Sequence, residues 1–546
     1  MAERERQPTT RDWIAVFGAI LGAFMAVLDI QITNASLQQI QGGLAASLDE
    51  GSWISTAYLA AEIVTIPLSA WFADVFTTRN YLIANCIAFL VFSMLCGLSD
   101  NLTMMIICRA GQGFTGGVFI PSAMTIVLRC LPVSKRSIGL AMFGVTATFA
   151  PAIGPTIGGW LTDTYSWHWI FYINLVPGAV LIWAIGAGLD RGEMHLDRLA
   201  GGDWPGIVSM ALGLGSLTTV LEEGQRKDWF GNPMIRDLSI VAVIFIPLFI
   251  LFELLHKQPF INLRLWKQPA FAGASLMGFG LGIGLYGTVF VLPVYLAQIQ
   301  NYDALQIGEV VMWQGLPQLL VFPFVPLVMR YADARAVVAF GLVLFAASCF
   351  LNSYLTHDWA IQQLRWTQLV RAAGQPFIIV PLSSLAVGFL PEREQGGGSA
   401  IFNIMRNFGG SFGIAMLSTF ATIREHYHFS VIGDRLTQNS LRTSALIGQY
   451  THALTSRTPQ GPAVTHMRAL SEIAATVRVE AFVMAYSDCF FVVGIVLSLC
   501  VPLLFVLKKP GSEKKPVLEK KPGPEPTRPA RARARAGGLR PAPRQR

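Results

Sequence analysis

Long apolar runs separated by short polar segments fill most of this chain. A helix of about 20 apolar residues crosses a bilayer, and runs of that length recur fourteen times. The pattern predicts an all-α polytopic membrane protein in which an even number of spans leaves both termini on one side. The expected spans are approximately 12–32, 53–72, 81–99, 102–128, 137–161, 168–189, 204–222, 237–255, 270–296, 306–329, 335–355, 366–389, 397–423 and 483–507.

An internal repeat divides these spans into two related halves. Residues 109–114 read RAGQGF and residues 371–377 read RAAGQPF. Each copy is followed by a Leu-Pro pair, ending at Pro132 or Pro391, with a phenylalanine eleven residues after the proline and a glycine twenty-two after it. The fourth and fifth spans therefore correspond to the twelfth and thirteenth. This correspondence predicts a 6+2+6 arrangement, with two helices inserted between halves of six, as in transporters built from structural repeats.

The repeat sets the expected domain boundaries. We expect a short N-terminal segment, an N-terminal half, the two inserted helices, a C-terminal half that contains a long polar segment, and a basic tail. Their residue ranges are 1–11, 12–189, 190–267, 268–507 (with the polar segment at 424–480) and 508–546. Loops as long as 424–480 usually have a role. We expect this one to dock a periplasmic partner, with a solvated insertion as the alternative.

Charge gives the expected orientation. Hydrophobic residues make up 53% of the chain and charged residues 14%, which excludes an ordinary soluble domain. Lysine and arginine concentrate in the even-numbered loops, for example at Arg79, Lys135 and Arg198, with Arg226 and Lys227 as the main exceptions. By the positive-inside rule both termini are expected in the cytoplasm.

The tail, residues 508–546, carries the basic charge of the whole chain. It holds 13 Lys or Arg against 3 Glu, a net charge of +10, whereas the whole chain carries +8. The rest of the chain is thus close to −2. We expect a disordered tail attracted to anionic lipid, and no nucleic-acid partner.

Enzyme and cofactor signatures are absent from the sequence. The seven cysteines have no paired spacing, and no Walker-type glycine loop is present. His426 and His428 in the polar segment fall far short of a metal-binding pattern. We expect neither an enzyme nor a bound metal or cofactor.

Three ionisable side chains lie inside predicted spans of the first half: Asp29, Glu62 and Arg109. Charge inside a bilayer is costly and usually faces a water-filled cavity or a partner. We therefore expect a proton-coupling cluster on one side of a central cavity, in which Asp29 or Glu62 carries the proton and Arg109 tunes its affinity. The alternatives are a static Asp–Arg pair and, for Asp29, a helix end wetted by lipid headgroups.

Polar residues of the second half are the expected lining of a substrate cavity. Asn403, Arg406 and Asn407 share one helix face, and Arg406 is expected to orient substrate or to pair with Asp488. Arg371 lies nearer a span end and is expected to snorkel. Gln314 and Gln318 form a further polar face for which helix-to-helix hydrogen bonding is the alternative. The complete expected lining is Gln314, Gln318, Asn403, Arg406, Asn407 and Asp488.

The string APAIGPTIGG at 150–159 is the expected gate. Gly154 and Gly158 lie four residues apart and give a flat face for close helix packing. Pro151 and Pro155 have the same spacing and remove amide donors, which bends a helix. Together with Gly159 they predict a rigid, bent helix that packs against the other half.

These motifs resemble those of the fourteen-span drug:proton antiporter branch of the major facilitator superfamily, and most closely its EmrB-type members. Similar strings are LDIQITNASL at 28–37, RAGQGF, APAIGPTIGG and WHWIFYINLVPG at 167–178. The resemblance assigns the branch's acidic residue to Asp29 and its functional arginine to Arg109. The loop motif WFADVFTTRN keeps Asp74 and Arg79 as gating residues, but has alanine at 70 and threonine at 77 where the family prefers glycine.

The resemblance implies a proton-coupled antiporter that exports hydrophobic drug-like compounds by alternating access. It further implies a Gram-negative inner membrane, a periplasmic membrane-fusion adaptor and an outer-membrane channel. One alternative keeps the fold and changes the cargo to a fatty acid, a siderophore or another metabolite. Another is a non-transporting membrane scaffold or sensor.

Overall fold

The computed structural model describes residues 7–256, 259–436, 440–457 and 462–507. These residues form helices and connecting loops, and none of them belongs to a strand. Apolar stretches bounded by polar caps produce this result. Helix α1 (Thr10–Ala35), for example, begins at a capping box in which Thr9 and Asp12 exchange side-chain and backbone hydrogen bonds. The expectations for the basic tail lie outside the described residues.

The first half is built from six apolar segments, two of which are broken. The fourth span consists of α6 and α7, and the sixth of α9 and α10. In order the helices are α1 (Thr10–Ala35), α4 (Trp53–Phe76), α5 (Thr78–Gly97), α6 (Leu102–Gly116), α7 (Phe119–Cys130), α8 (Val133–Thr164), α9 (Trp169–Tyr172) and α10 (Leu175–Gly188), with short connecting helices α2 (Leu37–Gly43) and α3 (Leu48–Gly51).

The helices of the expected inserted pair and of the expected second half follow. The connecting helix α11 (Asp197–Ala200) leads to the inserted helices α12 (Trp204–Glu223) and α13 (Pro233–Leu255). The helices of the second half are α14 (Pro269–Gln298), α15 (Ala304–Val321), α16 (Phe324–Tyr331), α17 (Ala334–Asn352), α18 (Ile361–Gly374), α19 (Pro376–Val387), α20 (Glu392–Arg435), α21 (Leu441–Arg457) and α22 (Pro462–Cys500).

The number of apolar spans differs from the expected fourteen. Within the described residues, 12 helices are long and apolar enough to cross a membrane, or 13 if the bent pair α15 and α16 forms one span. The missing one is the expected span 397–423, which lies inside α20. Its sequence places Asn403, Arg406 and Asn407 within two turns, and these residues lower its apolar character.

The bend between α15 and α16 is 52°. Pro317, in the span expected at 306–329, does not break the helix, because α15 continues through it. The break instead falls at Phe322 and Pro323, where α15 ends and Pro323 caps α16. The bend is therefore a junction between the two helices α15 and α16, and not a proline kink within one helix.

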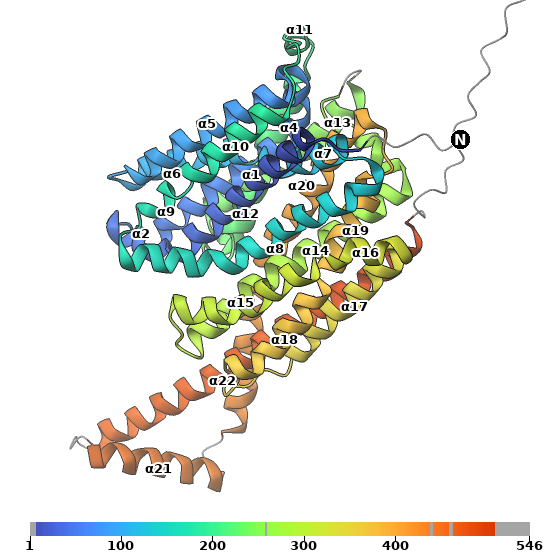
Figure 1. Ribbon diagram of the computed structural model, residues 1–546. Helices are drawn as coiled ribbons and strands as arrows, with labels where there is room; N and C mark the ends of the chain where they lie inside the picture. The colour runs from blue at the N-terminus through green and yellow to red at the C-terminus, as the bar shows by residue number, and fades with distance from the viewer. Residues whose placement is uncertain (1–6, 257–258, 437–439, 458–461, 508–546) are drawn as a thin grey trace, which may run out of the picture. The chain divides into compact units, whose positions relative to one another are not determined.

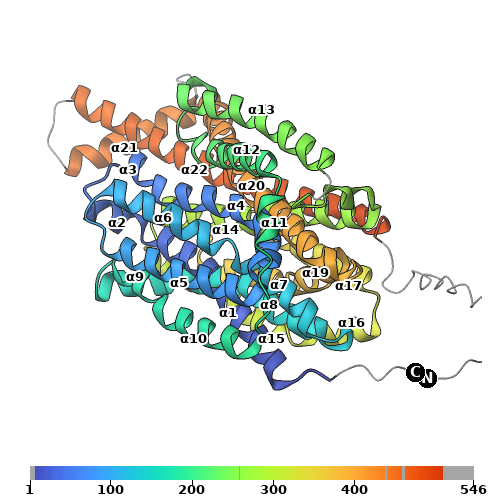
Figure 2. The same cartoon turned by 90° about the horizontal axis from the view of Figure 1, so that it is seen from above.

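The two inserted helices occupy different positions. Helix α12 packs against α13, α4 and α20, and therefore contacts both halves (Figure 2). Half of the most apolar stretch of α12 is buried inside the protein (50%), against 17% for α13. Helix α12 is consequently part of the core, whereas α13 covers its outer side.

The polar segment 424–480 is mostly helical in its described residues. It comprises the last turns of α20, the whole of α21 and the first turns of α22, and α21 packs on α22 beyond the other helices (Figure 1). We call this antiparallel unit the hairpin. The end of the bundle from which it extends is the hairpin end, and the opposite end, where α1 begins, is the terminal end.

The halves touch directly at the terminal end. The Ser399 hydroxyl in α20 donates to the Pro121 carbonyl of α7 at 3.3 Å. The Asn403 amide contacts the Met124 sulfur at 3.7 Å. Helix α20 of the second half therefore packs directly against α7 of the first half at the terminal end.

Candidate functional site

Asp29 and Arg109 form a fully buried ion pair inside the first half. The Nη1 atom of Arg109 in α6 lies 2.6 Å from Oδ2 of Asp29 in α1, and the two side chains are 1% and 0% exposed. The guanidinium also lies 4.3 Å from the centre of the Tyr58 ring in α4. Desolvating two charges is costly and is offset only by good geometry and further hydrogen bonds. The pair therefore depends on the residues around it.

Amide side chains complete this network. Gln112 and Asn174 donate to Oδ1 of Asp29 at 2.9 Å and 2.6 Å. Arg109 donates to the Gln112 side-chain oxygen at 2.7 Å and, through Nε, to the Ile54 carbonyl at 3.3 Å. Gln112 and Asn174 were not predicted as site residues, although both lie inside the quoted motifs RAGQGF and WHWIFYINLVPG. Asn174 reaches Asp29 because it stands at the break between α9 and α10.

Glu62 lies apart from this pair, in a central cavity. It is 4% exposed, and its Oε1 has no hydrogen-bond partner among the described residues. Asp29 and Arg109 are not among the residues that line the cavity. The expected three-membered cluster is thus divided into a closed ion pair and a carboxylate that faces the cavity, with Tyr58 one helical turn from Glu62 on the Arg109 side.

The central cavity has a volume of about 420 Å³ and lies between the two halves, toward the hairpin end. Seven helices of the two halves and the inserted helix α12 contribute to it. Most of the lining is apolar or aromatic, which is typical of sites for small organic molecules. Its polar lining residues are Gln31, Asn34, Glu62, Thr218, Glu222, Tyr286, Asn407 and Ser411.

Glu222 is a cavity residue that the sequence analysis missed. It lies in the last turn of α12, and its Oε1 is buried without a hydrogen-bond partner among the described residues. The sequence analysis did not consider Glu222 or Glu223, which lie at the end of the span expected at 204–222. Only the packing of α12 between α4 and α20 brings it to the cavity.

The three polar residues of α20 have different surroundings. Asn407 lines the cavity, and its Oδ1 has no hydrogen-bond partner among the described residues. Arg406 is buried (4% exposed) beside the cavity and is not among the lining residues. Asn403 lies outside the cavity lining and donates to the Ser399 carbonyl at 2.8 Å. It belongs to the contact between the halves at the terminal end.

Gln314 and Gln318 form the alternative arrangement, helix-to-helix hydrogen bonds. Their amide nitrogens donate to the side-chain oxygen of Gln375 at 3.0 Å and 2.6 Å. Neither residue is among those lining the cavity. The contact ties α15 to the junction of α18 and α19.

The expected pairing of Asp488 with Arg406 is wrong. Asp488 in α22 accepts from Arg424 at 2.6 Å and lies 2.8 Å from His428, both in α20. Glu425 and Arg478 form a further pair at 3.2 Å. The continuation of α20 past the expected span end puts Arg424 nearer to Asp488 than Arg406. These contacts fasten the base of the hairpin rather than the cavity.

Arg371, expected to snorkel, is buried (1% exposed). Its guanidinium lies 5.3 Å from the centre of the Phe345 ring, and Nη2 donates to the Leu285 carbonyl at 3.5 Å. The expectation was wrong because α18 packs into the second half along the repeat-related position. No acidic partner of Arg371 occurs among the described residues, in contrast to Arg109.

The glycine face of α8 packs closely, as expected, but against its own half. A Cβ atom at Gly154 would lie 2.5 Å from Cβ of Gln31, and one at Gly158 would lie 3.0 Å from the Ile32 carbonyl. Both partners belong to α1. Any side chain at these two glycines would separate α1 from α8.

A different face of α8 meets the second half. Ala152 packs against Gly315 of α15, where even a methyl group would collide. Pro155 lines the central cavity, and Pro151 and Gly159 are buried. Helix α8 therefore contacts α1, the cavity and the other half.

The degraded loop motif contains a strained backbone position. Thr77 has φ 70° and ψ 141°, a conformation that glycine adopts far more readily. This is the position at which the family prefers glycine. Arg79 donates to the Gly186 carbonyl at 3.2 Å. Asp74 is exposed, and no ion pair joins it to Arg79 in the described part of the chain.

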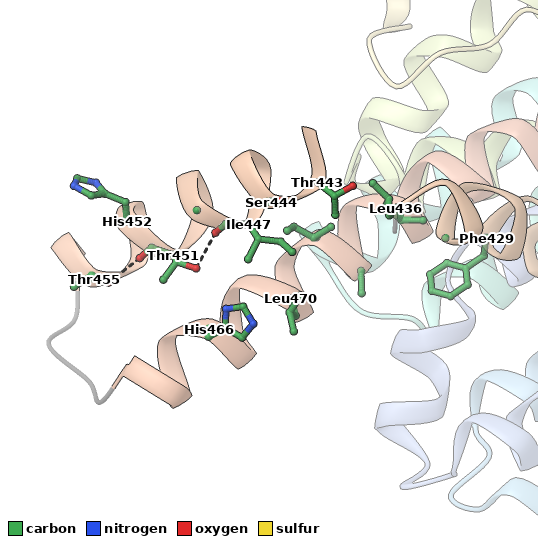
Figure 3. Close-up of a pocket in the computed structure, with 15 residues that line it drawn as sticks. Phe429, Leu436, Thr443, Ser444, Ile447, Thr451, His452, Thr455, His466 and Leu470 are labelled. Atoms are coloured by element: carbon green, nitrogen blue, oxygen red, sulfur yellow. Dashed lines mark hydrogen bonds between the residues drawn. The ribbon is translucent and has the colours of Figure 1, made fainter. Parts of the chain in front are cut away.

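A second cavity, of about 1000 Å³, lies within the hairpin. Figure 3 shows Phe429, Ile447 and Leu470 beside it, contributed by α20, α21 and α22. Thr451 and Thr455 turn their hydroxyls back to carbonyls of their own helix at 2.7 Å. The inner face of the hairpin is consequently mostly apolar. No group of three potential metal-binding side chains occurs in the described ranges.

The fold and the cavity between two repeat-related halves define a membrane transporter. The profile of the Major Facilitator Superfamily matches residues 19–414, and the chain belongs to that superfamily. The human organic anion transporter MFSD10 (TETRAN) has a similar fold, with a TM-score of 0.57 at 13% identity over 90% of this chain and 99% of its own.

Sequence relatives specify the branch. The colistin resistance protein EmrB of Acinetobacter baumannii is 34% identical over 493 residues, 90% of this chain and 95% of the relative. The multidrug export protein EmrB of Escherichia coli K12 is 28% identical over 90% of this chain and 94% of its own. The fatty acid resistance protein FarB of Neisseria gonorrhoeae is 27% identical over 90% and 95%. The chain is an EmrB-type inner-membrane exporter of drug-like compounds and not an enzyme.

Proposed function

We propose that this exporter is driven by protons and works by alternating access between the two halves. The observation that carries the proposal is Glu62, a buried carboxylate that faces an apolar cavity with one oxygen unpartnered. Such a group is costly when ionised and unpaired, and it gains from binding either a proton or a charged ligand. It is therefore suited to exchange one for the other.

Asp29 and Arg109 have a second role in this proposal. Their pair is closed and fully hydrogen-bonded, so Asp29 lacks direct access to the cavity in this conformation. We assign the proton that exchanges with the cavity to Glu62. The Asp29–Arg109 pair holds α1 and α6 together and opens when the half rearranges.

The direction of access follows from the contacts between the halves. At the terminal end α20 touches α7 through Ser399 and Asn403, whereas the cavity lies toward the hairpin end. With both termini in the cytoplasm, as the positive-inside rule predicts, this is the outward-facing state. The helix α8, with Pro151, Gly154, Pro155, Gly158 and Gly159, and the loop of Asp74 and Arg79 are the proposed gating elements.

An anionic cargo such as a fatty acid is less well supported. It would need a cationic group in the cavity, and no lysine, arginine or histidine is among the described residues that line it. Arg109 is occupied by Asp29, and Arg406 lies behind the lining. A non-transporting scaffold or sensor does not account for carboxylates buried around a cavity.

Proton coupling is tested by proton release from purified protein in detergent. A pH-sensitive dye in weakly buffered solution should report release when a transported compound is added, because the ligand replaces the bound proton. The test compounds are a panel of hydrophobic cations, neutral molecules and anions. Demonstrated binding without release for every compound would overturn the coupling mechanism.

We further propose that the hairpin docks a periplasmic membrane-fusion adaptor, which in turn engages an outer-membrane channel. The mostly apolar cavity inside the hairpin and the charged anchors at its base support this role. Replacing residues 441–476 by a short flexible linker should abolish co-purification with the adaptor encoded in the same cell. Proton release should remain within about twofold of the intact chain. Retained co-purification would contradict the docking role.

A further inference from the structure

We propose that Glu222 of the inserted helix α12 is a ligand-binding carboxylate of the central cavity, and that the cavity selects amphiphilic organic cations. The inference deepens the proposed export function and names its substrate class. It also gives one inserted helix a direct part in the site, beyond a connection between the two halves.

The neighbouring residue Glu223 fixes how α12 is turned. It is 1% exposed and accepts hydrogen bonds from the Ser52 and Thr56 hydroxyls of the first half at 3.0 Å and 2.7 Å. On the other side, Gln225 donates to the Thr422 hydroxyl of α20 at 3.2 Å. These bonds hold the end of α12 between the halves with Glu222 directed to the cavity. Of the two adjacent carboxylates, Glu223 therefore has a structural role, and Glu222 is free to bind a ligand in the cavity.

Among the described residues, no ion pair joins Glu222 to a basic side chain, and its Oε1 has no hydrogen-bond partner. Its neighbour in sequence, Glu223, is another acid, and the described residues that line the cavity include no lysine, arginine or histidine. Since we assign Glu62 to proton exchange, Glu222 is the lining carboxylate that remains to bind a cation. A buried charge of this kind is strongly stabilised by a cation.

The rest of the lining indicates what kind of cation fits. The formal charges among the described lining residues are the two carboxylates, and no basic side chain accompanies them. Tyr286, Phe290 and Phe408 add aromatic rings, which attract organic cations. A strongly hydrated metal ion would gain little from such a surface. A ligand with an apolar body and one delocalised positive charge matches both the apolar, aromatic lining and the carboxylates of the cavity.

The test compares two probes of nearly equal shape and opposite charge, tetraphenylphosphonium and tetraphenylborate. Binding to the purified full-length chain is measured by equilibrium dialysis at fixed pH. The intact chain should bind the phosphonium and discriminate against the borate. Glu222→Gln should weaken phosphonium binding by about tenfold, as expected for removing one charge interaction in a partly solvated site, and should reduce the preference between the two probes.

Two further variants separate charge from folding. Glu222→Asp keeps the carboxylate and should retain phosphonium binding within about threefold. Glu472→Gln makes the same chemical change at an exposed position of the hairpin, outside the cavity, and should leave binding unchanged. Equal binding of both probes by the intact chain, or unchanged selectivity in Glu222→Gln, would overturn the inference. Proton release is measured separately, so its loss or retention tests the export mechanism and not this assignment.

Discussion

Replacing Arg109 by methionine is expected to destabilise the protein by about 3–5 kcal/mol, the cost of leaving a buried partner charge uncompensated. Asp29 would keep its two amide donors but lose the guanidinium 2.6 Å away. Thermal unfolding in detergent, followed with a thiol-reactive fluorogenic dye, is a suitable measurement. Six of the seven cysteines are buried and become reactive on unfolding.

The control is the double variant Asp29→Asn, Arg109→Met. Removing both charges eliminates the unpaired carboxylate, so the double variant should unfold at a higher temperature than Arg109→Met alone. Double-mutant analysis then gives the coupling between the two residues. Equal destabilisation by the single and double variants would show that Arg109 matters through packing against Tyr58 and not through its charge.

The second large effect is expected for Glu62→Gln. A gradient of about one pH unit supplies about 1.4 kcal/mol per proton, enough for roughly tenfold accumulation of a neutral substrate. Glutamine cannot carry the proton, so accumulation in proteoliposomes should fall to about the external concentration. Substrate exchange without a gradient should persist, because the fold and the cavity remain.

Asp29→Asn and Glu472→Gln complete this experiment. Glu472→Gln, the control variant in the hairpin, should accumulate substrate like the intact chain. If Asp29→Asn abolishes accumulation while Glu62→Gln retains it, the proton belongs to Asp29 and our assignment to Glu62 is wrong. Loss in both variants would indicate that the two acids titrate as a coupled pair.

The helical character and the superfamily were within reach of the sequence, which also showed Asp29, Glu62 and Arg109 as charges inside apolar runs. The family motifs that contain Asp29 and Arg109 are short local strings. The charge of Glu62 stands out because it lies inside an apolar run, which is visible without coordinates. The internal repeat likewise pointed to paired halves. The separation of Glu62 from the Asp29–Arg109 pair was not predictable, since it depends on which face of α4 turns toward α6.

Other misses have a common physical cause. Asp488 binds Arg424 because α20 continues as a helix past the membrane, where hydrophobicity no longer marks it. Arg371 is buried by α18 packing within its half, which span position alone does not reveal. Glu222 was overlooked because a carboxylate at a span end normally reaches water. In each case the deciding contact joins residues from separate helices.

The continuous length of α20 has a mechanical consequence. With 44 residues, it extends about 66 Å at the rise of an α-helix, roughly twice the hydrocarbon thickness of a bilayer. A tilt of about ten degrees around its midpoint would move each end by roughly 6 Å. One end touches the first half and the other forms the hairpin, so α20 acts as a lever. Each change between inward and outward access would therefore displace the hairpin, together with any protein bound to it.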